Sequence, residues 1–304
     1  MIMNNTQKGY IGATISAVFF GCSGLFVKLA QGTNLDSVSI LILQYIITVP
    51  FMWVISFFRY KKQIKISKKD LITLFLIGMF LQSSVSICYY ESFKYLDISV
   101  ATILLFTYPI MVTLFSSIFL KAKLNKMIIS SVFIAFLGCI LVLDVFHINT
   151  TISVKGILFS LGGAVFLASS NMCLETFGDR IQPFVLSTYT STFIFLNLLI
   201  FRFPPTLLHG NISNFQWMIA ALLAFVCQIP PNVLMYAAIQ YIGAVKTAII
   251  GNVEIPAAAL LGYIFYGETM NFLQILGIVL VIGGIMLMEN SEYVKRKFKK
   301  LGNA

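Results

Sequence analysis

A single carboxylate, Glu254, lies inside the apolar stretch 244–266, where Lys246 near one edge is the only other ionisable group apart from tyrosines. A charged side chain at the centre of a membrane helix costs roughly 2.5–3.5 kcal/mol on insertion scales, so this one is expected to be protonated, paired or in contact with water. Its chemistry would be that of a substrate or proton site. The alternative is structural: a neutral acid that donates a hydrogen bond to a carbonyl freed by Pro256, which has no N–H.

Amides and prolines interrupt a second apolar stretch. The segment "CQIPPNVLMY" (227–236) contains Gln228 and Asn232 around two prolines, and interrupted helices are the usual place for a transporter's binding site. A simple kink stabilised by these amides is the alternative. The corresponding stretch in the first half of the chain, "LQSSVS" (81–86), contains Gln82. Polar groups at the same depth in both halves favour a shared cavity.

The candidate substrate-binding residues are polar or aromatic groups that lie within apolar stretches. They are Glu254, Asn252, Gln228, Asn232, Gln82, Asn171, Gln44, Tyr45, Tyr89, Tyr236 and Tyr108. Each of these amides, considered singly, has an alternative role: it can form a hydrogen bond between two helices instead of binding substrate. The tyrosines can line a pocket, although most aromatic side chains of such a chain face lipid or the membrane interface.

The possible catalytic motifs of this chain lack the partner residues that their chemistry needs. The segment "GCSG" (21–24) matches a motif of intramembrane serine proteases, but a serine nucleophile needs a histidine base within hydrogen-bond reach. The only histidines, His147 and His209, fall in predicted loops, and no second intramembrane acid accompanies Glu254. No Gly-x-x-x-x-Gly-Lys sequence for phosphate binding is present. We therefore predict neither an enzyme nor a cofactor. The five singly spaced cysteines are predicted to pack rather than bind metal.

The composition places these polar groups in a lipid environment. The 304 residues are 59% hydrophobic and 11% charged, with a mean hydropathy of +0.91, whereas soluble domains are about a quarter charged. Apolar stretches long enough for a transmembrane helix, which needs roughly 20 residues, occur at 9–30, 37–58, 70–93, 98–120, 126–144, 155–175, 184–203, 214–239, 244–266 and 271–289. The expected fold is an all-α integral membrane protein of ten transmembrane helices.

The basic residues set the orientation of these helices. The net charge of +10 does not indicate a nucleic-acid partner, because the basic residues form short clusters between apolar stretches. If both termini are cytoplasmic, 17 of the 21 Lys and Arg residues lie on the inner side, including the clusters in 59–69 and 295–300. This asymmetry predicts a multi-pass protein of the cell membrane with cytoplasmic N- and C-termini.

The chain partly repeats itself at an offset of 147 residues. The segment "KGYIGATISAVFFGCSG" from Lys8 aligns with "KGILFSLGGAVFLASSN" from Lys155, and at the same offset Pro109 aligns with Pro256. Each half of the chain, 1–150 and 151–304, contains five predicted helices. Because five is odd, the second half is expected to enter the membrane inverted relative to the first, as in many secondary transporters.

These features resemble the drug/metabolite transporter superfamily, EamA type, over nearly the whole chain. The resemblance rests on the two five-helix halves, on "VEIPAAALLGYIFYGET" (253–269) and on "LGIVLVIGGIMLM" (276–288). In that family a Glu-Pro pair recurs within helix nine and a Gly-Glu pair at its end. Here one residue separates Glu254 from Pro256, and the first half has Lys-Ala where Gly-Glu often stands. The resemblance implies a carrier of small organic metabolites, often an exporter of amino acids or related compounds.

The leading hypothesis is therefore a secondary transporter with alternating access to a small-molecule substrate. Export is favoured, and proton coupling is left open. Helices five (126–144) and ten (271–289), the poorest in polar groups, are expected outside the cavity as scaffold or homodimer contacts. A channel or scaffold without active transport is the first alternative, but it predicts polar stripes along whole helices or none. An intramembrane enzyme is the last alternative, because it predicts a pair of reactive groups at equal depth.

Overall fold

The structure is a computed structural model that describes residues 4–31, 37–119, 121, 125–144, 153–177, 180–204, 207, 212–267 and 269–301. Within these ranges every regular element is helical. Nine helical stretches of the described chain are long and apolar enough to span a membrane, and Lys126–Val142 is a shorter apolar helix. These ten stretches confirm the predicted all-α membrane fold. The predicted boundary between the halves, at 150, lies outside the described residues.

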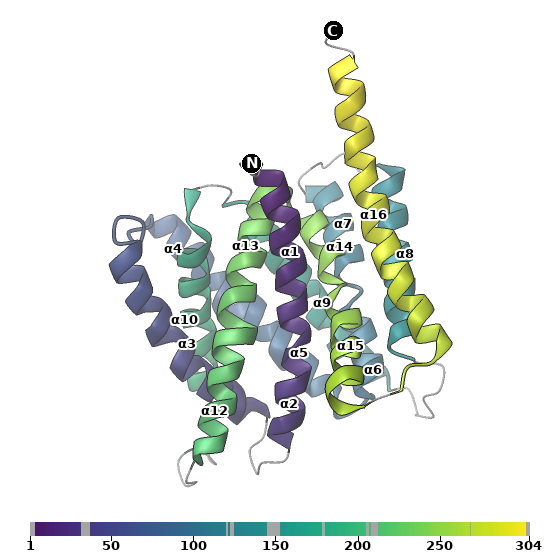
Figure 1. Ribbon diagram of the computed structural model, residues 1–304. Helices are drawn as coiled ribbons and strands as arrows, with labels where there is room; N and C mark the ends of the chain where they lie inside the picture. The colour runs from purple at the N-terminus through teal and green to yellow at the C-terminus, as the bar shows by residue number, and fades with distance from the viewer. Residues whose placement is uncertain are drawn as a thin grey trace.

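The first half of the chain supplies five of these stretches (Figure 1). In chain order they are α1 (Asn5–Gly21) with α2 (Ser23–Gln31); α3 (Ser37–Arg59); α4 (Lys68–Leu76), η1 (Ile77–Gln82) and α5 (Ser83–Ser92); α6 (Ile98–Leu105) with α7 (Tyr108–Phe119); and α8 (Lys126–Val142). The π-helical segment η1 joins α4 and α5 into one span. A short turn separates α6 from α7 within helix four.

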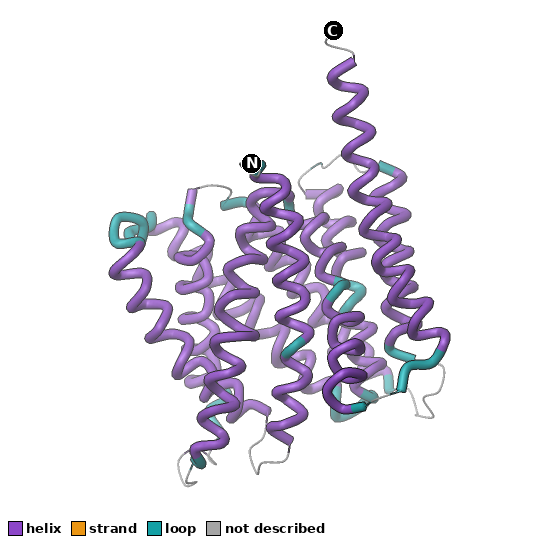
Figure 2. Tube along the Cα trace, viewed as in Figure 1, coloured by secondary structure: helices purple, strands orange, loops and turns teal. Residues whose placement is uncertain are grey.

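The second half repeats this pattern of interruptions. Its elements are α9 (Val154–Glu175); α10 (Pro183–Phe201); α12 (Asn214–Leu222), η4 (Leu223–Gln228) and α13 (Ile229–Ile242); α14 (Ala244–Gly251) with α15 (Glu254–Tyr266); and α16 (Phe272–Leu301). The bounds of η1 and η4 differ by 146 residues, and so do the first residues of α6 and α14 and those of α7 and α15. Figure 2 shows the interruption of helix nine as a loop between α14 and α15. The sequence repeat thus appears as helix interruptions at equivalent places.

The proline pair after η4 does not end helix eight. Proline lacks the N–H that an α-helix needs, and a π-helical turn before it accommodates the missing donors without separating the helix into two. Side chains satisfy carbonyls of this turn: Gln44 Nε2 of α3 donates to Leu223 O at 3.4 Å, and Asn232 Nδ2 donates to Gln228 O at 2.7 Å. The expected break in helix eight is therefore a widened turn.

The π-helical segment of the first half is supported in the same way, although no proline follows it. Ser83 Oγ donates to Gly78 O at 2.8 Å, and Asn197 Nδ2 of α10 donates to Met79 O at 2.9 Å. Each π-helical segment is thus bonded by an amide from the other half of the chain. These bonds support the two segments midway along helices three and eight, where unpaired carbonyls would be costly.

The two halves interleave in space. α1 packs against α13, α14 and α15 of the second half, and α9 packs against α5, α6 and α7 of the first. We call α1 with helices eight (α12–α13) and nine (α14–α15) the α1 group, and α9 with helices three (α4–α5) and four (α6–α7) the α9 group. The helices α3 and α10 contact each other, and they also contact α12 and η1, respectively. Each group therefore combines helices from both halves.

Helices five and ten, α8 and α16, lie side by side at one edge of the bundle (Figure 1). Their backbones approach closely, because a Cβ atom at Gly138 would lie 2.6 Å from Gly277 O, and one at Gly277 would lie 2.6 Å from Gly138 O. Small residues permit such contact between membrane helices. This pair forms a peripheral unit of its own.

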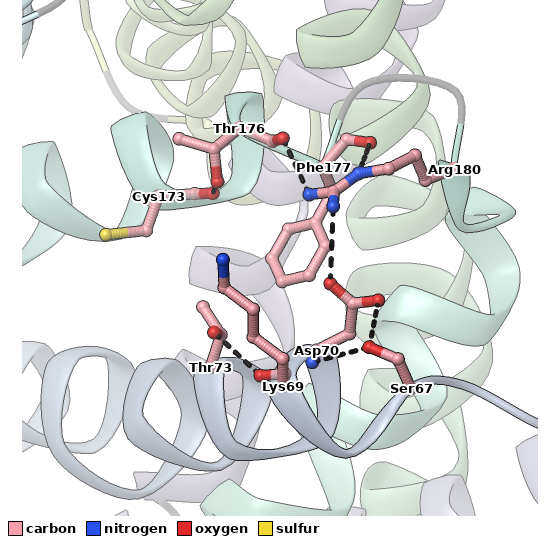
Figure 3. Close-up of polar contacts among 8 residues, drawn as sticks. All are labelled: Ser67, Lys69, Asp70, Thr73, Cys173, Thr176, Phe177 and Arg180. Atoms are coloured by element: carbon pink, nitrogen blue, oxygen red, sulfur yellow. Dashed lines mark hydrogen bonds and ion pairs between the residues drawn. The ribbon is translucent and has the colours of Figure 1, made fainter.

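Both ends of the chain lie at the same side of the bundle (Figure 1). An ion pair near this side joins α4 to the segment after α9, with Arg180 Nη1 at 3.7 Å from Asp70 Oδ1 (Figure 3). The guanidinium also donates to the carbonyls of Phe177 and Thr176, and Ser67 Oγ caps α4 by accepting from the Asp70 N–H. Because the Arg180 side chain is 59% exposed, this pair contributes little stability.

Candidate functional site

A cavity of about 350 Å³ lies between the α1 group and the α9 group, at the depth of the helix interruptions. We call the residues that line it the wall. Residues of helices one to four and six to nine contribute to the wall, and no described residue of α8 or α16 does. The expected position of helices five and ten, outside the cavity, is therefore confirmed. The volume is at the lower end of the range of ligand pockets, about 300–1,000 Å³.

Glu254 lines the cavity where helix nine is interrupted. It is the first residue of α15, directly after a turn that contains Asn252. α1 packs tightly against this point, because a Cβ atom at Gly21 would lie 2.8 Å from Glu254 O. No side chain among the described residues donates a hydrogen bond to the Glu254 carboxylate. The backbone thus holds Glu254 in place, with the positive end of the α15 dipole beside it, and its carboxylate is available to a ligand.

Gln228, the last residue of η4, is held by two residues of α3. Its Nε2 donates to the Tyr45 hydroxyl at 2.9 Å, and its Oε1 accepts from Gln44 Nε2 at 3.2 Å. Gln228, Tyr45 and Asn232 belong to the wall, whereas Gln44 is 5% exposed and lies behind it. Gln44 therefore positions Gln228 rather than contacting the cavity.

Gln82, the last residue of η1, is held in a related way by the second half. Its Nε2 donates to the Tyr236 hydroxyl at 2.8 Å, and that hydroxyl lies 3.2 Å from Thr190 Oγ1 of α10. Gln82 belongs to the wall, and Tyr236, 2% exposed, lies behind it. Each π-helical segment thus ends in a glutamine that bonds a tyrosine from the opposite half of the chain.

Two further tyrosines line the cavity near helix four. The Tyr89 hydroxyl lies 2.7 Å from Thr102 Oγ1, and the Tyr108 hydroxyl donates to Ala248 O at 3.3 Å. A Cβ atom at Gly251, the last residue of α14, would overlap with the Tyr108 hydroxyl. Helices four and nine therefore contact each other here. Tyr108 directly follows the interruption of helix four, and Gly251 directly precedes that of helix nine.

The structure brings together most of the predicted site residues. Those in the wall are Glu254, Gln228, Asn232, Gln82, Asn171, Tyr45, Tyr89 and Tyr108. Gln44 and Tyr236 lie one layer behind and hold the two glutamines. Asn252 is fully buried in the turn before Glu254 and is not part of the wall.

Sequence reasoning missed several wall residues, among them Ser86, Tyr90, Phe20 and Phe106. Helical spacing could have found two of them. Ser86 and Tyr90 follow Gln82 at i+4 and i+8, so all three share one face of helix three. The two phenylalanines carry no such signal, because each of them ends a run of apolar residues in the sequence.

The described wall contains one carboxyl group and no basic side chain. Apart from Glu254, the described wall contains no Asp, Glu, Lys, Arg or His. In the part of the chain that the structure describes, no group of three or more His, Cys, Asp or Glu side chains is placed to hold a metal ion. The wall therefore offers one carboxyl, several amides and hydroxyls, and six aromatic rings.

Comparison with known proteins agrees with the repeated architecture. The sequence model of the EamA-like transporter family matches residues 7–144 and, a second time, residues 154–289. The uncharacterized transporter YxxF of Bacillus subtilis is 26% identical over 285 residues, which cover 91% of this chain and 88% of that protein. Solute carrier family 35 member G1 of Mus musculus is 27% identical over 194 residues, 60% of this chain and 51% of that protein.

The fold is also similar to a solved structure. A crystal structure at 13% sequence identity superposes with a TM-score of 0.75 and covers 93% of this chain and 96% of the other. At that identity the likeness concerns the arrangement of the helices alone.

Proposed function

Because the chain belongs to the EamA-like transporter family, we propose that it is a secondary carrier of small organic metabolites that works by alternating access. The observation that carries this proposal is the place of the cavity. It lies between the α1 group and the α9 group, each of which combines helices from both halves of the chain. A rocking movement of one group against the other opens such a cavity to one side of the membrane at a time.

The helix interruptions lie where the helices would have to bend during such a movement. Helices four and nine are interrupted by turns, and helices three and eight contain π-helical segments, all next to the cavity. Such segments have weaker or displaced backbone hydrogen bonds and often mark functional sites. Conformational changes between packed domains use a few residues of this kind as hinges. We therefore assign the hinge points of the carrier to these four places.

Glu254 is the group to which we assign binding of the substrate or, in an empty cavity, of a proton. A protonated carboxyl is neutral and avoids the cost of a charge within the membrane. A substrate with a positive charge can replace that proton, which couples substrate binding to proton release. The wall amides of Gln228, Asn232 and Gln82 orient the substrate around this charge.

We also propose the direction and the orientation of the carrier. The substrates are amino acids or compounds related to them, and they are exported from the cytoplasm. Both termini are cytoplasmic in the cell membrane, because 17 of the 21 basic residues then lie on the inner side. The close pair α8 and α16, which leaves the cavity free, is the surface that we assign to a homodimer.

A reconstituted system tests this function. A panel of amino acids, amines and related metabolites is ranked by thermal stabilisation of the purified protein, because a ligand of the folded state raises its apparent stability. The stabilising compounds are then assayed by counterflow in liposomes. We expect saturable counterflow of at least one compound, its loss in Glu254→Gln, and its retention in Glu289→Gln, a matched change on the exposed surface of α16. Flux that rises linearly with concentration, without counterflow, would indicate a channel and contradict the proposal.

A further inference from the structure

The α1 group and the α9 group pack against each other toward one side of the membrane. Across the boundary between the groups, α14 packs against α7 and α9, and α13 packs against α9. Figure 1 shows α7 and α14 nearer than α6 and α15 to the side of the bundle that holds both ends of the chain. We call this the termini side. On the opposite side no pair of described elements packs to a similar extent across the boundary.

Buried apolar side chains fill this junction between the groups. One hydrophobic cluster includes residues from the end of helix six and from helices eight and nine, among them Leu174, Phe177, Ile239, Ala244 and Ala248. Each of these five residues is at most 1% exposed. Protein interiors contain few voids larger than a water molecule. This apolar layer therefore separates the cavity from the solvent on the termini side.

A carboxylate joins the two groups beside the apolar layer. Glu175 is the last residue of α9, and its Oε2 accepts a hydrogen bond from the Ala244 N–H at 3.2 Å. Ala244 is the first residue of α14, and the first N–H groups of a helix have no partner within it. A negative charge at this place also interacts favourably with the positive end of the helix dipole. Glu175 therefore caps helix nine from the opposite group.

The residue before α14 admits this carboxylate. Gly243 has a φ angle of +86°, which residues with a side chain rarely adopt. A Cβ atom at Gly243 would lie 3.0 Å from Glu175 Oε1, so the missing side chain lets the carboxylate approach the helix end. The positive charge of Lys246 interacts with the same carboxylate. Backbone conformation and charge thus both favour the contact of Glu175 with helix nine.

A second hydrogen bond crosses the same boundary. Gln240 Nε2 of α13 donates at 2.8 Å to Ile181 O, in the segment between α9 and α10. Arg180 of this segment pairs with Asp70 of α4 (Figure 3), which ties the segment to the α9 group. Both partners of the Gln240 bond are neutral, so it is weaker than the bond to the Glu175 carboxylate. Both bonds must break when the groups separate on the termini side.

We propose that Glu175 is the gate residue of the carrier: its bond to the Ala244 N–H holds the cavity closed toward the termini side. The bond breaks whenever the cavity opens to that side. This inference rests on the proposed function and adds which contact controls the movement. A bond that exists in only one of two states shifts their ratio by its own free energy. For a hydrogen bond to a charged group that shift is about tenfold, so loss of the carboxylate favours the state open to the termini side.

Access of a thiol reagent to the cavity from each side of the membrane tests this gate. The reporter is Ser86→Cys, at a wall residue, in the full-length chain with its native cysteines replaced. An impermeant maleimide is added to intact cells or to inverted membrane vesicles, and the two labelling rates are expressed as a ratio. Gln63→Cys, in the turn between α3 and α4, identifies the termini side. We expect the reporter to react faster from the opposite side.

Two matched changes are then made in the reporter protein. Glu175→Ala should shift the ratio of the labelling rates about tenfold toward the termini side, because it removes the charged acceptor. Glu289→Ala removes an exposed acid at the end of the α16 span and should leave the ratio unchanged. If Glu175→Ala does not fold, Glu175→Gln takes its place. It keeps a hydrogen-bond acceptor and loses the charge, so it should shift the ratio in the same direction by a smaller factor.

The outcomes separate this inference from the proposed function. Equal ratios in the Glu175 and Glu289 variants would overturn the inference. Faster labelling of the unaltered reporter protein from the termini side, or none from either side, would overturn it too. Counterflow of a compound together with an unshifted ratio would leave the carrier function standing without this gate. A shifted ratio in a protein that shows no counterflow of any compound would support the gate and refute the carrier.

Discussion

Replacing Gly251 by alanine tests how the interrupted helices four and nine are held together. Gly251 is the last residue of α14, and an added Cβ atom would overlap with the Tyr108 hydroxyl of α7. That hydroxyl donates to Ala248 O at 3.3 Å. The new methyl group must therefore displace the tyrosine and break its hydrogen bond.

The magnitude follows from three terms. Overpacking a filled site costs about 1–3 kcal/mol, and the lost hydrogen bond adds about 0.5–1.5 kcal/mol. Alanine in place of glycine in a helix returns up to about 1 kcal/mol. We expect Gly251→Ala to lower the free energy of unfolding by about 0.5–4.5 kcal/mol. Tyr108→Phe alone should lower it by about 0.5–1.5 kcal/mol, since it removes only the hydrogen bond.

A double-mutant cycle, measured by equilibrium unfolding in detergent, checks this contact. Tyr108→Phe removes the hydroxyl that Gly251→Ala displaces, so the double variant should be more stable than Gly251→Ala alone. Contacting residues show coupling of about 0.5–3 kcal/mol, whereas independent sites add within about 0.5 kcal/mol. Additive effects of the two changes would refute the reasoning, because the glycine and the hydroxyl would then not meet.

Three further changes probe other parts of the molecule. Gly21→Ala should destabilise the protein by about 1–3 kcal/mol and reduce transport, because its Cβ atom would lie 2.8 Å from the backbone at the helix nine interruption. Gly24→Ala, with nothing within 4 Å, should alter stability by no more than about 1 kcal/mol, and equal effects of the two would be inconsistent with the close packing. Arg180→Ala should cost less than about 1 kcal/mol in unfolding experiments, because its ion pair is exposed; a much larger loss would give that pair a structural role. Gln63→Cys, in a chain whose native cysteines are replaced, should resist an impermeant thiol reagent added outside intact cells, and ready labelling would reverse the proposed orientation.

The number of spans and their sequence positions could be predicted from the sequence because the membrane imposes a simple rule. Every backbone polar group in the hydrocarbon layer must be paired, so a spanning segment is a helix and its apolar length reveals it. The interruption of helix nine was also visible, since Glu254 and Pro256 break its apolar character. The polar character of Glu254 also indicated its place at the cavity.

The division of the polar residues between the wall and the layer behind it could not be predicted. Gln44 and Tyr45 are adjacent, so successive side chains point in different directions around the helix. Which of them faces the cavity depends on the rotation of α3, and that rotation is set by packing against α10 and α12. The widened turn at η4 also depends on a distant residue, because Gln44 satisfies one of its carbonyls.

The interleaving of the two halves could likewise not be predicted from the sequence. The repeat predicts two similar five-helix units, but it does not say whether each unit packs on itself. In the structure α1 joins helices eight and nine, and α9 joins helices three and four. These contacts link residues far apart in the chain, and a periodic pattern of apolar residues carries no information about them.

Modification of Glu254 by a membrane-permeant carbodiimide tests the central claim most directly. The reagent reacts with protonated carboxyl groups, and mass spectrometry of the digested protein locates the adduct. We predict an adduct at Glu254 in the empty carrier. A transported compound should protect Glu254, with half of the effect at the concentration that half-saturates transport. Modification of Glu254 that proceeds unchanged at a saturating concentration of a transported compound would show that substrate does not cover this carboxyl, and it would contradict the account.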